Sequence, residues 1–260
     1  MTDYKEIIEE FRDPTIDSWP LMSSPGPILS IVSIYLLFVI KIGPKLMENR
    51  PAFELKNFLI IYNASLIIFN IWLASLVTSI DLSALIHSKG CRLQNHQLSK
   101  NGSLETKLSK AAWWYFFSKI IELLDTVLFI LRKKQNQLTF LHIYHHSITA
   151  IFSWCYLKLI PGEQGIFIGI INAAVHIIMY TYYLISALGP KYKKYLWWKK
   201  YMTLVQLTQF GIIITYLLFT LVMDCGVPKV LTYFFIINTV IFIYLFSNFY
   251  KKTYIKHKKV

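Results

Sequence analysis

The stretch that decides the fold runs from Lys119 to His146 and reads KIIELLDTVLFILRKKQNQLTFLHIYHH. It places Lys119, Glu122 and Asp125 inside an otherwise apolar run, passes through a basic loop, and re-enters apolar sequence with three histidines. Ionisable side chains in lipid-spanning segments are rare and usually face a bundle interior or a wet cavity, so they mark a functional site by default. The pattern therefore predicts membrane helices and locates a functional site on them.

The composition around this stretch is that of a membrane protein. Of the 260 residues, 55% are hydrophobic, 16% are aromatic and only 16% are charged, which differs from the balance in soluble domains. A bilayer-spanning helix needs about 20 mainly apolar residues. Seven runs meet or approach this length, namely residues 27–42, 58–77, 111–130, 140–157, 165–188, 201–222 and 230–250. The sequence predicts an all-α, polytopic membrane protein with seven transmembrane helices.

The charge distribution predicts how these helices are threaded. A net charge of +13 would suit a nucleic-acid-binding protein, but the basic residues lie in loops rather than on one face of a domain. Lys and Arg accumulate on the cytoplasmic side of membranes. We therefore expect a lumenal segment 1–26, a transmembrane domain 27–250 and a cytosolic basic tail 251–260. The first segment lacks the apolar core of a cleavable signal peptide, and the tail resembles a dilysine signal for retrieval to the endoplasmic reticulum.

Turn residues and sequons refine this topology. Gly43-Pro44 is expected to close the first span and Gly189-Pro190 the fifth. The glycosylation pattern at Asn101 lies in a predicted lumenal loop, where it is open to modification, whereas the pattern at Asn63 lies within the second span. A disulfide between Cys91 and Cys225 remains open. No repeat or soluble domain interrupts the seven runs.

Three histidines form the first candidate site. His142, His145 and His146 stand at positions i, i+3 and i+4, which on a helix puts them on one face within about 6 Å of one another. The alternative is three core histidines with structural partners, but each of them would need a buried hydrogen-bonding group. The clustering favours a site.

Polar residues recur on two later spans. His176 in the fifth span has Asn172 four residues before it and Tyr180 four residues after it, so one stripe carries an amide, an imidazole and a phenol. Gln206 and Gln209 follow in the sixth span. Hydrogen bonding between membrane helices is the structural alternative for these residues.

In the third span, Lys119, Glu122 and Asp125 have two possible roles. An internal ion pair would fix the register of the helix, because an unpaired buried charge costs several kcal/mol. A carboxylate could equally hold the tautomer of a histidine. The sequence leaves both alternatives open.

A metal site is not expected. The pattern HxxHH is similar to that of membrane di-iron desaturases and hydroxylases, but those enzymes need more histidines than the seven present here. His87, His96 and His257 fall in predicted loops or the tail, far from the cluster. Without a metal, imidazole remains a base and a nucleophile.

Four blocks of sequence carry a family resemblance. They read KIIELLDT, FLHIYHH, NAAVHIIMYTYY and TLVQLTQF, and they occupy residues 119–126, 140–146, 172–183 and 203–210. In content, order and spacing they resemble the signature blocks of the very-long-chain fatty acid elongases, the condensing enzymes of animals and fungi. The resemblance covers residues 111–210 and extends more loosely to the layout of seven helices.

This resemblance implies a fold and a reaction. It implies a six-helix bundle enclosing an acyl tunnel, in the endoplasmic reticulum membrane. There malonyl-CoA would extend a long-chain acyl-CoA by two carbons to a 3-oxoacyl-CoA, with carbon dioxide and CoA released. It implies no cofactor beyond these two substrates. Basic cytoplasmic loops would bind the CoA phosphates, and the partners would be the reductases and dehydratase of the elongation cycle, with homo-oligomerisation left open.

The resemblance also assigns roles by position. His145 would attack the thioester and carry the acyl group as an acyl-imidazole, and His176 would act on malonate or the developing enolate. His142 and His146 would orient and tune the nucleophile. The remaining supporting residues would be Lys119, Glu122, Asp125, Asn172, Tyr180, Gln206 and Gln209. A transporter or seven-helix receptor, which can also bury His and Asp along a pathway, is the alternative function, and acyl-CoA turnover distinguishes the two.

Overall fold

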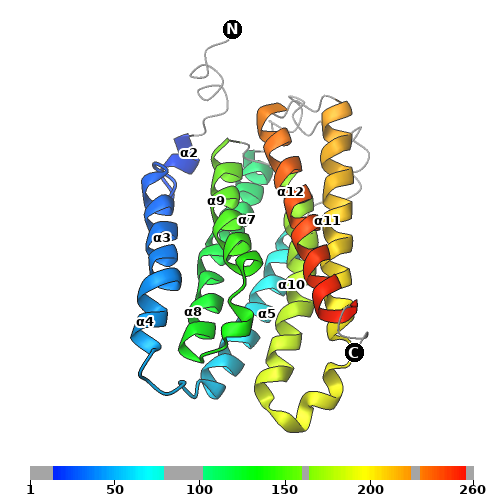
Figure 1. Ribbon diagram of the computed structural model, residues 1–260. Coiled ribbons are helices and arrows are strands. Elements are labelled where there is room, and N and C mark those ends of the chain that lie inside the picture. The colour runs from blue at the N-terminus through cyan, green and yellow to red at the C-terminus, as the bar shows by residue number, and fades with distance from the viewer. Residues whose placement is uncertain (1–13, 79–101, 160–163, 224–228, 256–260) are drawn as a thin grey trace. The chain divides into compact units, whose positions relative to one another are not determined.

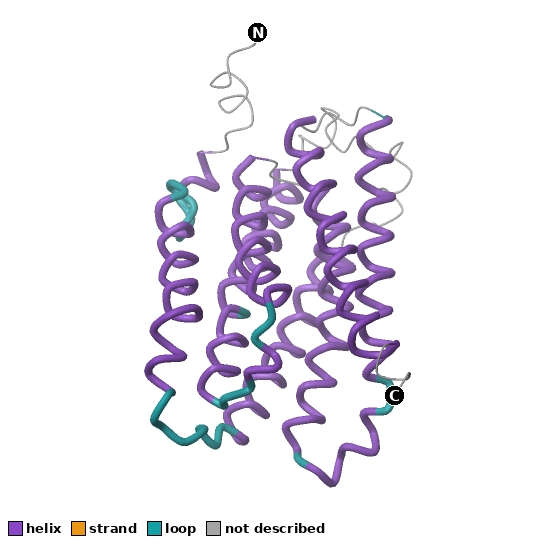
Figure 2. The backbone as a smooth tube through the Cα atoms, viewed as in Figure 1, coloured by secondary structure: helices purple, strands orange, loops and turns teal. Residues whose placement is uncertain are grey.

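The computed structural model describes residues 14–78, 102–159, 164–223 and 229–255. Within these ranges every regular element is a helix and none is a strand (Figure 2). The helices belong to two compact units, coloured by residue number in Figure 1. Unit 1 is built from residues in the ranges 1–55 and 102–166, and unit 2 from residues in the ranges 56–101 and 167–260.

Unit 1 begins with a short helix, α2, and contains three longer helical segments. The first segment is continuous through α3 (Gly26–Leu37), the π-helical turn η1 (Phe38–Ile42) and α4 (Gly43–Met47). The others are α7 (Gly102–Ile121) followed by α8 (Leu123–Leu131), and α9 (Phe140–Leu159); α2 covers Pro14–Asp17 and a 3-10 turn, η2, covers Gln135–Gln137. Helix α9 packs against both α3 and α7, and α4 packs against α8.

Unit 2 contains the remaining four long helices. They are α5 (Lys56–Thr78), α10 (Gln164–Leu188, whose first residues belong to unit 1), α11 (Lys199–Val222) and α12 (Lys229–Tyr250), with the shorter η3 (Pro190–Leu196) and η4 (Lys251–Ile255). Helices α11 and α12 pack along each other. The Phe210 ring on α11 lies 5.3 Å from that of Phe242 and 5.1 Å from that of Phe246 on α12.

Five helices of the described chain are long and apolar enough to cross a membrane. They are Gly26–Met47, Lys56–Leu76, Gly165–Leu188, Lys194–Val222 and Lys229–Ile255. The protein is therefore a multi-pass membrane protein. The other two expected spans form α7–α8 and α9, which are also helical. The first is interrupted at Glu122 and carries buried charges, and the second carries three histidines that lower its hydropathy. The total of seven spans stays a prediction.

The segment before α3 is attached to α7 and to the end of α9. Trp113 and Trp154 each donate an indole N–H to a backbone carbonyl of the turn at residues 20–22, over 3.1 and 2.8 Å. Lys158 donates to a third carbonyl of that turn at 2.9 Å and forms an ion pair with Asp17. The start of α3 and the end of α9 therefore lie at the same end of unit 1, as the predicted alternation of the loops requires.

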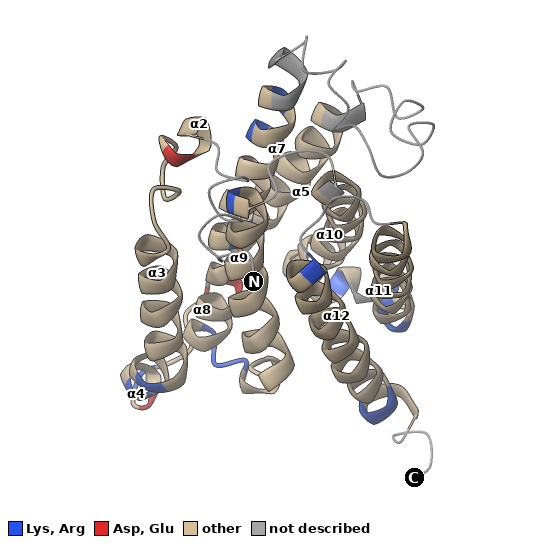
Figure 3. Ribbon diagram, turned by 90° about the horizontal axis from the view of Figure 1, so that it is seen from above, with Lys and Arg blue, Asp and Glu red and all other residues tan. Residues whose placement is uncertain are grey.

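Two basic loops meet at the opposite end of unit 1. The backbone N–H of Phe53 donates to the carbonyl of Leu131 at 3.0 Å, and the ammonium group of Lys133 donates to the carbonyl of Glu48 at 3.2 Å. Figure 3 shows blue ribbon both at α4 and in the loop that follows α8. These are the loops after the first and third predicted spans, and their contact is consistent with the prediction that both lie on one side of the membrane.

The expectation for the two Gly-Pro pairs is half right. Helix α10 ends at Leu188, before Gly189 with a φ of 115°, as expected. The expectation that Gly43-Pro44 closes the first span is wrong, because the helix continues to Met47. The π-helical turn η1 directly precedes Gly43, and Pro44 occupies the first turn of α4. A proline is tolerated in a first turn, where its missing N–H leaves no bond unmade.

Gly43 itself allows α4 to approach α8 closely. A Cβ atom added there would lie 2.9 Å from the carbonyl oxygen of Phe38 and 3.1 Å from the Cγ2 atom of Ile130. Both distances are shorter than ordinary van der Waals contacts. Only glycine fits without a shift of the backbone.

We expect Gly43→Ala to lower the free energy of unfolding by about 1 to 3 kcal/mol, the usual cost of overpacking. The matched control is Gly211→Ala in α11, where an added Cβ atom meets nothing within 4 Å. That variant should be neutral or more stable by up to about 1 kcal/mol, because alanine favours helix over glycine. Thermal unfolding of both variants in detergent micelles measures the difference, and equal behaviour would contradict the close approach.

Candidate functional site

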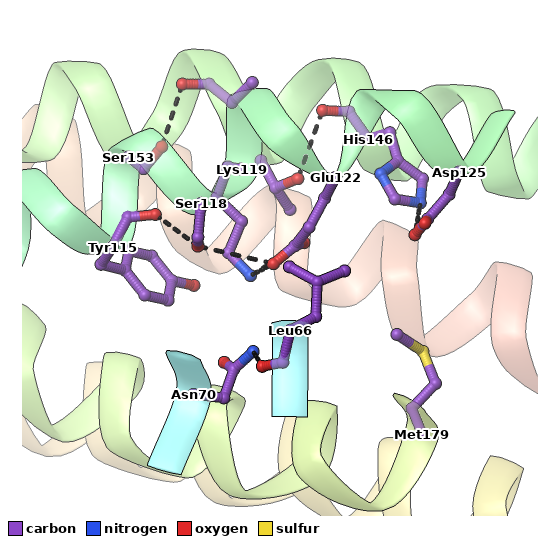
Figure 4. Close-up of polar contacts among 12 residues, drawn as sticks. Leu66, Asn70, Tyr115, Ser118, Lys119, Glu122, Asp125, His146, Ser153 and Met179 are labelled. Atoms are coloured by element: carbon purple, nitrogen blue, oxygen red, sulfur yellow. Dashed lines mark hydrogen bonds and ion pairs between the residues drawn. The ribbon is translucent and has the colours of Figure 1, made fainter. Parts of the chain in front are cut away.

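An ion pair is buried at the junction between α7 and α8. The ammonium group of Lys119 donates to both carboxylate oxygens of Glu122 at 2.9 and 3.1 Å, and the two side chains are only 2% and 1% exposed (Figure 4). The ammonium group also lies 4.7 Å from the centre of the Tyr115 ring, a cation–π distance. Ser118 contacts Glu122 at 3.5 Å. Burial of either charge alone would be costly, and the pair offsets this.

Asp125 lies near a different partner from that of Glu122. Its Oδ2 atom lies 4.0 Å from the Nε2 atom of His146 on α9, and the side chains are 8% and 7% exposed (Figure 4). The two roles that the sequence left open for these carboxylates are thus divided between them. Glu122 forms the internal ion pair, and Asp125 faces a histidine.

The three histidines share one face of α9, as predicted. The ring centre of His146 lies 4.3 Å from that of His142 and 5.5 Å from that of His145. His146 is buried, whereas the other two are partly exposed. The spacing i, i+3, i+4 produces this cluster because residues three and four apart are neighbours on a helix surface.

His142 has a hydrogen-bond partner that joins it to the first membrane helix. Its Nε2 atom lies 3.0 Å from the hydroxyl oxygen of Thr126 on α8, which lies 2.7 Å from the hydroxyl oxygen of Tyr35 on α3. The sequence interpretation missed Tyr35. The available indication was a phenol within a mainly apolar span, where a buried hydroxyl needs a partner.

Glu122 marks an irregular turn in the third expected span. Its backbone N–H bonds to the carbonyl of Ser118 at 2.8 Å, but its carbonyl accepts from Asp125, three residues later, at 3.1 Å. This local tightening separates α7 from α8. The sequence predicted one uninterrupted helix here. The turn coincides with the buried ion pair, so the backbone departs from regular geometry at the charged position.

The other candidate residues lie in unit 2. Asn172, His176 and Tyr180 are all buried on α10, and the rings of His176 and Tyr180 meet edge to face at 5.7 Å. The predicted polar stripe is therefore present. On α11, Gln209 is buried, and the Gln206 amide donates to the sulfur of Met179 on α10 at 3.8 Å. This last contact supports hydrogen bonding between helices as one role of Gln206.

Several expectations concern residues outside the described ranges, namely His87, Cys91, His96, Asn101, Cys225, Lys256, His257 and Lys258. Asn63, in contrast, is buried within α5 and bonds to the carbonyl of Leu59, as a sequon inside a span requires. Among the described residues no group of three or more His, Cys, Asp or Glu side chains is arranged to hold a metal ion. A metal-free reaction stays a prediction.

Comparison with known proteins identifies close similarity along almost the whole chain. Residues 20–260 match the model of the family described as ELO: GNS1/SUR4. The chain is 42% identical to very long chain fatty acid elongase 4 of Homo sapiens, covering 99% of this chain and 82% of that protein. It is 40% identical to elongase 7 of Drosophila melanogaster, over 97% and 76%, and 40% identical to elongase 1 of Mus musculus, over 99% and 91%.

The buried ion pair of Lys119 and Glu122 allows a prediction about stability that does not depend on catalytic activity. Lys119→Met should lower the free energy of unfolding by about 3 to 5 kcal/mol, because it leaves the Glu122 carboxylate uncompensated. The double variant Lys119→Met with Glu122→Gln should recover most of this loss. Thermal unfolding in detergent micelles measures both. A double variant no more stable than the single one would show that the two residues do not act as a pair.

Proposed function

The chain belongs to the ELO (GNS1/SUR4) family, and from this membership we infer that it is a condensing acyltransferase of very-long-chain fatty acid elongation. The reaction joins a long-chain acyl group to malonyl-CoA. Carbon dioxide leaves the malonyl group, the acyl carbonyl carbon bonds to the resulting carbanion, and CoA leaves the acyl donor. The product is a 3-oxoacyl-CoA two carbons longer. The family membership favours this enzyme over the transporter or receptor alternative.

The observation that carries the chemistry is the histidine face of α9 against the acidic and hydroxyl side chains of α8. His142 lies within hydrogen-bond distance of Thr126, and Nε2 of His146 lies 4.0 Å from a carboxylate oxygen of Asp125, so two of the three imidazoles have a polar partner on the neighbouring helix. Orientation by a fixed partner is what catalytic imidazoles require, because the partner decides which nitrogen carries the proton. Structural histidines need such partners too, so the assignment is tested by kinetics below.

We assign the nucleophile to His145, the second of the three histidines, as the family resemblance implies. Its nitrogen lone pair attacks the thioester carbonyl, the C–S bond breaks and CoA leaves as the thiolate. The acyl group then resides on the imidazole. The partial exposure of His145 suits a group that must meet a substrate. His142 and His146 serve as its supporting neighbours.

The second half of the reaction is assigned to His176. In this proposal it acts on the malonyl group as carbon dioxide leaves, and it stabilises the enolate that attacks the acyl-imidazole. Asn172 and Tyr180, buried one turn to either side of it, support its ring. Gln206 and Gln209 complete the polar surface of unit 2, and Lys119 with Glu122 fixes α7 in unit 1.

The family and the charge bias support a proposal for the setting of the enzyme. We propose seven transmembrane helices, of which six enclose an apolar tunnel for the acyl chain, in the endoplasmic reticulum membrane. The N-terminus would be lumenal and the tail cytosolic. The basic loops that meet at one end of unit 1 would then face the cytosol, where they can bind the phosphates of CoA. The reductases and dehydratase that process a 3-oxoacyl-CoA are the expected partners.

His145→Ala should abolish elongation while the protein remains folded in the membrane, because the covalent route loses its nucleophile. Purified protein is given a long-chain acyl-CoA and labelled malonyl-CoA, and 3-oxoacyl-CoA formation is measured. The control is Tyr144→Phe, which changes the neighbouring residue of α9 and should leave turnover near that of the wild type. Substantial turnover by His145→Ala would remove His145 from this role.

His176→Ala should separate the two half-reactions. Incubation with labelled acyl-CoA alone should still label the protein and release CoA, whereas addition of malonyl-CoA should yield no extended product. Mass spectrometry of the intact protein measures the first step and product analysis the second. Equal loss of both steps would contradict the division of roles between His145 and His176.

Chelation tests the metal-free proposal. Treatment with EDTA should leave elongation unchanged, since the acylation and condensation steps assigned above use only imidazoles and the two substrates. Activity is compared before treatment, after it, and after addition of iron or zinc. Loss with EDTA and recovery with either metal would make a metal part of the reaction.

A further inference from the structure

Three side chains from three helices form a chain of hydrogen bonds that ends at a histidine of the candidate site. Tyr35 is on α3, Thr126 on α8 and His142 on α9. The two hydroxyl oxygens are 2.7 Å apart, and the Thr126 oxygen lies 3.0 Å from Nε2 of His142. Tyr35 is 6% exposed and Thr126 is fully buried. Because the two hydroxyl-bearing side chains are shielded from solvent, their protein partners decide where the hydroxyl protons lie.

The number of hydroxyl protons determines which group donates and which accepts along this chain of hydrogen bonds. Each hydroxyl has one proton to donate. Within the described residues, the Tyr35 hydroxyl has Thr126 as its hydrogen-bond partner, and Thr126 has only Tyr35 and His142. If Nε2 of His142 carried a proton and donated it to Thr126, the proton of either Thr126 or Tyr35 would lack an acceptor in the described structure. A buried donor without an acceptor costs about 1 to 3 kcal/mol.

Only one arrangement gives both hydroxyl protons an acceptor within the chain of hydrogen bonds. Tyr35 donates to Thr126, Thr126 donates to Nε2 of His142, and the imidazole carries its own proton on Nδ1. An imidazole held in this way presents an N–H group and has its lone pair occupied. It is a hydrogen-bond donor, and it can neither accept a proton nor attack a carbonyl at Nε2 without breaking the bond to Thr126.

We propose that Tyr35, in the first membrane helix, is a positioning residue of the elongation site that acts through Thr126 to hold His142 in the tautomer protonated on Nδ1. This inference rests on the proposed function, because it gives His142 a donor role beside the nucleophile His145. It adds α3 to the helices that control the chemistry. It also distinguishes His142 from His146, whose Nε2 atom faces a carboxylate instead.

The same contacts would also attach α3 to α8 and α9 if they served structure alone. The two roles differ in what a lost hydroxyl changes. If the contacts serve structure alone, loss of a hydroxyl lowers the stability of the protein but leaves the kcat of each folded molecule unchanged. A positioning role lowers kcat, leaves KM for both acyl-CoA and malonyl-CoA unchanged, and makes the Tyr35 effect depend on the Thr126 hydroxyl.

The kinetic test uses variants that remove hydroxyl groups with little change of shape. Tyr35→Phe should lower kcat by about 2- to 12-fold, the factor that corresponds to one hydrogen bond of ordinary net strength. Thr126→Val should lower it at least as much, and Thr126→Ser, which keeps the hydroxyl, should restore it. The control is Tyr156→Phe, 14 residues beyond His142 on α9 and therefore roughly 21 Å along the helix. It should retain the wild-type kcat.

Coupling of the two positions is the sharpest kinetic readout. In the Thr126→Val background, Tyr35→Phe should cause no further loss, because Tyr35 acts only through Thr126. Additive losses, or a Tyr35→Phe variant that matches Tyr156→Phe, would overturn the proposal. Thermal unfolding of each variant in detergent micelles shows whether a loss of kcat follows a loss of folded protein.

A second readout needs no turnover. Diethyl pyrocarbonate acylates an imidazole nitrogen that has an available lone pair, and mass spectrometry of peptides locates the label. Because Thr126 occupies the Nε2 lone pair, Thr126→Val should accelerate labelling of His142 by about 2- to 12-fold, the protection expected from one hydrogen bond. Tyr156→Phe should label at the wild-type rate.

The two readouts separate the proposals. Wild-type protein that does not extend acyl-CoA would overturn the proposed function, and the labelling rates would still decide how His142 is held. Wild-type protein that does extend acyl-CoA, with equal labelling of His142 in all variants, would overturn the positioning role alone.

Discussion

The structure of unit 1 depends on the cost of placing charge at membrane depth. Lys119 and Glu122 are nearly inaccessible to solvent, and either charge alone would cost several kcal/mol. Their bidentate contact, with the ring of Tyr115 and the hydroxyl of Ser118 close by, offsets that cost within α7. Helix α9, which carries the three histidines, packs on the same helix. The buried pair and the imidazoles therefore belong to one packed group of helices in unit 1.

Three polar residues at the start of α8 and just before it have different partners. Glu122 compensates a cation, Asp125 faces the Nε2 atom of His146, and Thr126 contacts the Nε2 atom of His142. Asp125 and Thr126 are consecutive, and their partners are four residues apart on α9. One turn of the histidine helix is therefore served by two adjacent residues of its neighbour. One short helix, α8, therefore supplies polar partners to two imidazoles.

The sequence revealed those parts of the site that follow from local spacing. A spacing of three or four residues on a helix predicted the histidine face of α9 and the polar stripe of α10. Charges in an apolar run marked the third span as a functional segment, with a buried ion pair as one of two alternatives. It did not reveal Tyr35, because the contact with Thr126 joins residues 91 positions apart and no local pattern encodes it. It also misjudged Gly43-Pro44 and missed the turn at Glu122. In both places tertiary packing and hydrogen bonding override the usual local preference of the backbone.

The long separation between Tyr35 and Thr126 has a consequence for biosynthesis. A ribosome adds about 5 to 20 residues per second. Tyr35 is therefore synthesised roughly 5 to 18 seconds before its partner Thr126 on α8. The interval between Leu21, in the turn after α2, and its partner Trp154 is longer, because they are 133 residues apart. Until Thr126 has been made, the Tyr35 hydroxyl lacks the partner that it has in the folded unit. The chain of hydrogen bonds from Tyr35 through Thr126 to His142 can therefore be completed only after α9 has been synthesised, late in the assembly of unit 1.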